Sequence, residues 1–102
     1  MTTKRENTAL MERERSKLQP PKLYKIILLN DDYSTMEFVV EVLLIFFAMG
    51  RERAMQVMLK VHTEGSAVCG VYPKDSAETK VAQVTTFAIE HGHPLRCILE
   101  DE

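Results

Sequence analysis

The sequence predicts an α+β fold, in which a three-stranded, mostly antiparallel sheet packs against helices in the order β-α-α-β-α-β. Short segments that are apolar or alternate in polarity, bounded by Pro, Gly or Asn-Asp, are typical of strands. Longer segments with apolar residues three or four positions apart are typical of helices. At 102 residues, of which 45% are hydrophobic, the chain suits a single domain with one core.

The first strand is predicted within residues 22–30. Its apolar run, residues 26–29, starts with two β-branched isoleucines and lies between a Pro pair and Asn30-Asp31. A short apolar run bounded by such turn residues indicates a largely buried strand.

The first helix is predicted to follow directly. Ser34 and Glu37 have the spacing of a capping box, in which both side chains satisfy free backbone N–H groups. Residues 38–47 are apolar on nearly every face, so this helix should be covered on several sides. We expect Gly50 to end it in the left-handed conformation.

A second helix is predicted over residues 51–64. Ala54, Met58 and Val61 form its apolar stripe, and Gly65 supplies its stop. A strand should follow over residues 66–72. Alternation places three of its side chains on one face: Ala67, Cys69 and Val71.

The last helix and strand complete the pattern. Asp75 and Glu78 predict a second capping box, and Gly92 and Pro94 a helix end. The apolar residues between them have helical spacing: Ala77, Val81, Val84 and Ala88. Those of the final strand alternate with Arg96 and Glu100: Leu95, Cys97 and Leu99.

The chain divides into a polar extension, residues 1–21, and a folded core, residues 22–102. The extension carries five Lys/Arg against three Asp/Glu and ends in Pro20-Pro21, so we expect a flexible tail and linker. The core carries eight Lys/Arg against twelve Asp/Glu. A core of charge −4 disfavours phosphate backbones, so we expect no nucleic-acid partner.

Cysteine usage and hydropathy indicate a cytoplasmic protein. Cys69 and Cys97 lie in apolar, alternating segments without a Cys-x-x-Cys motif, which is typical of buried thiols in a reducing compartment. Residues 38–49 are too short, with Glu41 among them, to span a bilayer, and the amino terminus resembles no signal peptide. We expect a monomer without a membrane partner.

The segment from Leu28 to Phe38 is the most informative for function. An apolar strand ends on Asn30-Asp31-Asp32, where hydrogen-bond acceptors converge beside apolar residues. That combination suits a cation attached to an apolar group, such as a free amino terminus followed by a large side chain. Asn and Asp are also ordinary turn residues, so this segment alone leaves both interpretations open.

Several motifs in order resemble the ClpS family of adaptors for the Clp unfoldase-protease. The resemblance covers residues 20–100 and is carried by the run from Pro20 to Val39. The further motifs are Ala54-Met55-x-x-Met58-Leu59-x-Val61-His62-x-x-Gly65, Val68-Cys69-Gly70-Val71, Lys80-Val81 and His93-Pro94-Leu95. Where many members have Thr-Pro at the helix start, this chain has Ser34-Thr35, which loses the preorganised proline but keeps a capping hydroxyl.

The resemblance implies recognition of N-degrons, whose first residue is Leu, Phe, Tyr or Trp, and their delivery to the amino-terminal domain of a ClpA-type AAA+ unfoldase. It implies that Asn30, Asp31 and His62 bind the substrate's α-amino group. It assigns the side-chain pocket to Met36, Val39, Met58, Val61 and Leu95, with Ser34 or Thr35 at the edge. Glu78 and Lys80 would contact the unfoldase, although solvated helix charges are an alternative.

Other classes of function find less support. A hydrolase that used His62 with Asp31 or Asp32 would need a nucleophile. The sequence has neither a Gly-x-Ser-x-Gly elbow nor a cysteine beside a histidine, so we expect no enzymatic activity and no catalytic residues. His91 and His93 could ligate zinc, but His-Gly-His after a helix is more simply a turn; no metal or cofactor is expected. An interaction module that does not read amino termini is the serious alternative.

Overall fold

The structure of the protein, a computed structural model, describes residues 20–102, so the tail predicted over residues 1–19 lies outside the described residues. The elements follow the predicted order. They are β1 (Leu23–Leu29), α2 (Met36–Phe46), α3 (Arg51–Glu64), β2 (Ser66–Pro73), α4 (Lys74–Glu90) and β3 (Arg96–Asp101).

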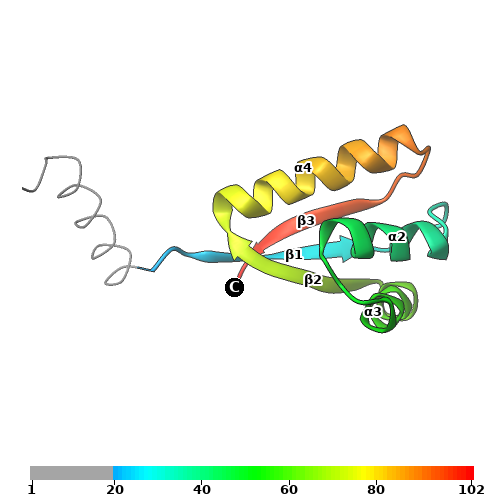
Figure 1. Cartoon of the computed structure of the whole chain (residues 1–102), viewed down its shortest axis with the longest axis horizontal. Helices are drawn as coiled ribbons and strands as arrows, with labels where there is room; N and C mark the ends of the chain where they lie inside the picture. Colours follow the sequence, from blue (N-terminus) through cyan, green and yellow to red (C-terminus); the bar gives the residue numbers. More distant parts are fainter. Residues whose placement is uncertain (1–19) are drawn as a thin grey trace, which may run out of the picture.

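The sheet has the strand order β2-β1-β3, and both pairings are antiparallel. The central strand is therefore β1, which confirms the predicted fold class. Figure 1 shows α4 running along the sheet beside β3, while α2 and α3 gather at the end of the sheet opposite the carboxyl terminus. At the other end, an exposed ion pair of 2.9 Å joins Lys22 to Asp101 across β1 and β3.

The core lies between the helices and one face of the sheet. Ile26 and Leu28 of β1 are fully buried there, as are Val42 and Leu43 of α2 and Val84 of α4. On the other face, half-buried Ile27 pairs with Val68 and Ile98, which are 43% and 45% exposed. Within residues 20–102, one face of the sheet is thus covered by helices and the other is partly exposed.

The first helix begins one residue later than predicted. Thr35 is the N-cap of α2, and its hydroxyl accepts a hydrogen bond of 3.1 Å from the Phe38 N–H. The prediction of a capping box formed by Ser34 and Glu37 was therefore wrong. The reason is local, because the Ser34 N–H donates to the Asp31 side chain and holds Ser34 in the preceding turn.

The prediction for Gly50 was also wrong. Helix α2 ends at Phe46, and Ala48 takes the left-handed conformation with φ of 51°. Gly50 has φ of −70° and is the N-cap of α3. By contrast, Gly65 ends α3 as predicted, with φ of 92° and its N–H donating to the Val61 carbonyl at 2.9 Å.

A bulge changes which side chains of β2 face the core. The β1–β2 register shifts between Ile26 and Ile27, so Cys69 is the extra residue on β2. Ala67 and Cys69 are buried as predicted, but Val71 is 39% exposed. Strict alternation placed Val71 wrongly, because a bulge moves the residues beyond it to the other face.

The second capping box, Asp75 with Glu78, is not formed. Helix α4 already begins at Lys74, its N-cap position is Pro73, and no side chain caps it. Asp75 instead lies in the first turn, where a carboxylate interacts favourably with the helix dipole.

Candidate functional site

A cavity of about 380 Å³ opens where β1 ends and where α2 and α3 meet the connecting turn. It is lined by residues of the β1–α2 turn, the first turns of α2 and the second half of α3. These residues are Asn30, Asp31, Asp32, Tyr33, Ser34, Thr35, Met36, Val39, Met58, Val61 and His62.

Asp31 organises the polar end of the cavity. Its Oδ1 accepts hydrogen bonds from the backbone N–H groups of Tyr33, at 2.8 Å, and Ser34, at 2.6 Å, forming a tight local turn. Its Oδ2 is buried and has no hydrogen-bond partner within residues 20–102. One oxygen of the carboxylate therefore shapes the turn, and the other is buried at the cavity without a partner among the described residues.

The surroundings of Asp31 favour its charged form. Burial alone raises the pKa of this carboxyl, but the Ser34 hydroxyl and the N–H groups of Ser34 and Tyr33 lower it, with a smaller contribution from His93. The resulting pKa lies below the usual value for aspartate.

Apolar side chains form the floor of the cavity. Val39, Met58 and Val61 are buried, with 7%, 5% and 2% of their surface exposed. Met36, the first residue of α2, is 42% exposed and lies at the edge. Because a methionine side chain is unbranched and flexible, this edge can adapt to the shape of a ligand.

Asn30 and His62 complete the polar rim from two different elements. The Asn30 N–H donates to the Gly65 carbonyl at 2.9 Å, which fixes the end of β1 against the end of α3. His62 is exposed in the last turn of α3, one helical turn beyond Met58. Asn30, Asp31 and His62 thus all contribute to the lining of one cavity.

The cavity brings together all but one of the residues predicted for the site. Leu95 is absent from its lining, although it is buried with 2% of its surface exposed. Asp32 and Tyr33 also line the cavity and were not assigned to it. Their place in the same Asn-Asp-Asp-Tyr run was the available signal.

The His93-Pro94-Leu95 segment supports α2 from behind the cavity. The His93 ring stacks on Phe38, with ring centroids 3.9 Å apart, and Phe38 also stacks on Phe87 at 5.5 Å. The His91 Nδ1 donates a hydrogen bond of 2.8 Å to the Phe87 carbonyl, and its ring lies 4.1 Å from that of Phe87, centroid to centroid. Both histidines therefore take part in packing around the first turn of α2 and the end of α4.

The cysteines are buried and unpaired. Burial, with a smaller effect of Cys97, raises the pKa of Cys69 to about 12, and burial raises that of Cys97 to about 11. Thiols so hard to ionise are poor nucleophiles. Among residues 20–102 no three His, Cys, Asp or Glu side chains are placed to hold a metal ion, and no described helix is long and apolar enough to cross a membrane.

Lys80 and Glu78 lie on α4, away from the cavity. The Lys80 ammonium is 6.0 Å from the centre of the Tyr72 ring, and the same ring covers Gly70, where a Cβ would meet it at 2.6 Å. Lys80 also lines a shallow depression that includes Asp75. Glu78 is exposed.

Comparison with known proteins agrees with this description. The family model of the ATP-dependent Clp protease adaptor protein ClpS matches residues 19–98. ClpS adapter proteins of Nitrosospira multiformis and Aromatoleum aromaticum are each 54% identical over 101 residues, covering 99% of this chain and of the relative. The structure of Agrobacterium tumefaciens ClpS2 bound to L-phenylalaninamide is 46% identical, covers 80% of this chain and 99% of that one, and has a TM-score of 0.77.

Fold, cavity and relatives define a small α+β adaptor domain with a cavity at the end of its central strand. The chain belongs to the ClpS family of Clp protease adaptors. Its relatives are named as adapter proteins and not as enzymes.

Proposed function

We propose that this protein binds the free amino-terminal residue of polypeptides that begin with Leu, Phe, Tyr or Trp. It delivers them to the amino-terminal domain of a ClpA-type AAA+ unfoldase for degradation by the Clp protease. Asn30, Asp31 and His62 bind the α-amino group. The first side chain enters the apolar part of the cavity, formed by Met36, Val39, Met58 and Val61, with Ser34 and Thr35 at its edge.

The observation that carries this proposal is the unpartnered Oδ2 of Asp31 beside an apolar floor. A buried acceptor without a partner costs about 1–3 kcal/mol, and more when charged, so a cationic ligand here removes a penalty as well as adding an attraction. An α-ammonium has three donors, which matches Asn30, Asp31 and His62 as three acceptors.

The energies suit a complex that forms readily and can still be handed over. Burial of roughly 150–200 Å² of a Leu or Phe side chain contributes about 4–5 kcal/mol. Each charge-assisted hydrogen bond to the ammonium adds roughly 1.5–3 kcal/mol. After the cost of association, a dissociation constant of about 1 μM or somewhat below is expected.

The ligand of the Agrobacterium relative supports the same assignment. L-phenylalaninamide has a free amino group, an aromatic side chain and an amide in place of the next peptide bond. It therefore carries both chemical features that the cavity of this chain is equipped to bind. Leu95, which is buried in the core and absent from the lining, then acts in packing and not in direct contact with the ligand.

The unfoldase would contact the start of α4, around Glu78 and Lys80. The Lys80 ammonium lies 6.0 Å from the centre of the Tyr72 ring, on the face of α4 beside β2. We expect Lys80→Glu to leave peptide binding unchanged and to abolish degradation of a Phe-initiated reporter by ClpA with its peptidase. Unchanged degradation would remove this surface from the proposal.

The extension of residues 1–19 is proposed to act in hand-over and not in recognition. A chain shortened to start at Pro20 should bind a Phe-initiated peptide as tightly as the full chain and fail to deliver it. A tenfold loss of peptide affinity would place the extension in the binding site.

The direct test of recognition is a peptide series that varies only the first residue. Fluorescence anisotropy should give tight binding for Leu, Phe, Tyr and Trp, and at least about tenfold weaker binding for Ala or Asp, which lose most of the buried apolar area. Equal affinity across the series would favour an interaction module that does not read amino termini.

A further inference from the structure

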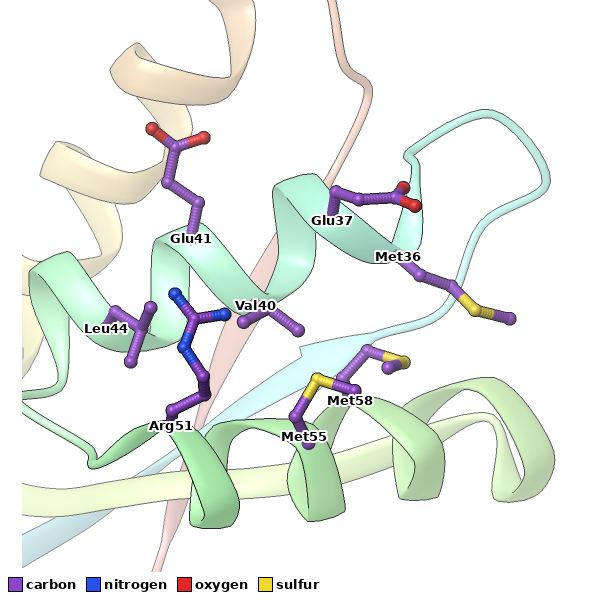
Figure 2. A pocket seen from close by; sticks show the side chains of 8 residues that line it. All are labelled: Met36, Glu37, Val40, Glu41, Leu44, Arg51, Met55 and Met58. Atoms are coloured by element: carbon purple, nitrogen blue, oxygen red, sulfur yellow. The ribbon is translucent and has the colours of Figure 1, made fainter.

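A second cavity, of about 360 Å³, lies between α2 and α3 next to the proposed recognition site. Figure 2 shows the side chains that line it on the two facing helices. Val40 and Leu44 of α2 and Met55 of α3 supply apolar surface, and Glu37 and Glu41 lie along the α2 side. We call this cavity the α2–α3 groove; Arg51, Met36 and Met58 complete its lining.

The groove and the recognition cavity share a wall. Met36 and Met58 line both of them, so the two spaces are adjacent and have these two methionine side chains in common. Met36 is 42% exposed at the start of α2, and a methionine there can move aside. A ligand chain that leaves the first cavity across Met36 therefore enters the groove directly.

The groove has the chemistry of a peptide-binding surface. Met55 is 42% exposed, whereas Val40 and Met58 are buried at the floor of the groove. No other described residue fills the groove, so an apolar side chain of a ligand could pack against these three residues. Glu37 and Glu41 are one helical turn apart and form no ion pair within residues 20–102. Two carboxylates against one guanidinium favour a basic residue in the ligand.

A polypeptide substrate must continue beyond its first residue. The ligand of the Agrobacterium relative, L-phenylalaninamide, ends at the amide from which such a chain would continue. An extended chain advances roughly 3.3–3.6 Å per residue, so residues two to four of a substrate stay within about 10 Å of the first site. The groove begins at the wall of that site and lies within their reach.

We propose that the α2–α3 groove is a second recognition site, which binds one apolar side chain from residues two to four of the substrate and favours Lys or Arg beside it. This inference rests on the proposed function, because the first cavity must hold the amino-terminal residue. Substrate choice by this protein then depends on a short sequence and not on the first residue alone.

Labelled peptides that begin with Phe test the apolar contact. In a reference peptide Ala occupies positions two to four, and in three others Leu replaces one Ala at a time. One Leu position should tighten binding roughly threefold to tenfold. Met55→Glu should abolish that gain, whereas the control Leu59→Glu, at an exposed position on α3 outside both cavities, should preserve it.

The charge preference is tested beside the favoured Leu position. A peptide with Arg at this neighbouring position should bind about fivefold more tightly than one with Glu at low ionic strength. The difference between the two affinities should decrease at high salt. Glu41→Lys should reverse this order. Glu100→Lys, the same charge change on β3 and outside the groove, should not.

The outcomes separate this inference from the proposed function. If the reference peptide fails to bind, the proposed function is wrong and the groove proposal falls with it. If it binds, but no Leu position and no groove variant changes its affinity, only the groove proposal is overturned. Loss of unfoldase binding in Met55→Glu, with peptide affinities unchanged, would also overturn it by assigning the groove to that partner.

Discussion

Replacing Asp31 by Asn separates the two roles that the structure gives this side chain. Oδ1 accepts from the N–H groups of Tyr33 and Ser34, and the amide oxygen of Asn can accept the same two bonds. The turn should therefore persist. At the position of the unpartnered Oδ2, however, Asn places an NH₂ group, which is a donor facing the ammonium of the substrate.

The expected loss follows from that exchange. One charge-assisted hydrogen bond is worth roughly 1.5–3 kcal/mol, which corresponds to an affinity about 10- to 150-fold lower for a Phe-initiated peptide. Asp32 provides a control, because it is exposed at the cavity mouth and accepts no hydrogen bond from the described residues. Asp32→Asn removes the same formal charge and should change the affinity by less than about threefold.

Fluorescence anisotropy with one labelled peptide measures both variants, and thermal unfolding checks that Asp31→Asn still folds cooperatively. If folded Asp31→Asn binds within twofold of the unmodified protein, Oδ2 does not contact the ligand. An equal loss in Asp32→Asn would instead attribute the effect to the overall negative potential of the cavity mouth.

Three further predictions concern the edge, the cap and the pH dependence. Met36→Ala should allow binding of peptides that begin with Ile or Val, because we expect their branched Cβ to clash with Met36. If the unmodified protein binds Ile-initiated peptides as tightly as Leu-initiated ones, Met36 does not exclude β-branched residues. Thr35→Ala removes the N-cap of α2 and should lower the free energy of unfolding by about 1 kcal/mol. Ser34→Ala removes no cap and should lower the free energy of unfolding by less than half as much; urea titrations measure both variants. The affinity difference between the unmodified protein and Asp31→Asn should persist from neutral pH until the pH drops below the usual aspartate value, because the lowered pKa of Asp31 keeps its carboxylate charged over that range. Peptide titrations of both proteins at several pH values check this, and loss of the difference well above that value would argue against the charged carboxylate as the acceptor.

Much of the fold and of the site could be predicted because local signals agreed with one another. The apolar run before Asn30 marked the central strand, and Gly65 marked the end of α3. Helical spacing placed Met58 and His62 on one face, and both now line the same cavity. The order of the elements then left few ways to pack three helices on a small antiparallel sheet.

What could not be predicted depends on contacts between residues far apart or on the detailed path of the backbone. Sequence spacing could not distinguish Ser34 from Thr35 as the cap, because the choice depends on the Asp31 turn that holds Ser34. The bulge at Cys69 shifts the β1–β2 register and exposes Val71, and no local sequence pattern predicts such a shift. The α2–α3 groove likewise exists only once the two helices face each other.

The central claim is that this protein reads a free amino terminus, and acetylation of one peptide tests it most directly. A Phe-initiated peptide and its Nα-acetylated form have the same side chains, but the acetylated form has lost the ammonium and its hydrogen bonds. Because at least two charge-assisted bonds disappear, the acetylated peptide should bind more than roughly 100-fold more weakly in anisotropy or calorimetry. Equal affinity for the two peptides would contradict the account, because the cavity would then bind the side chain without recognising the amino terminus.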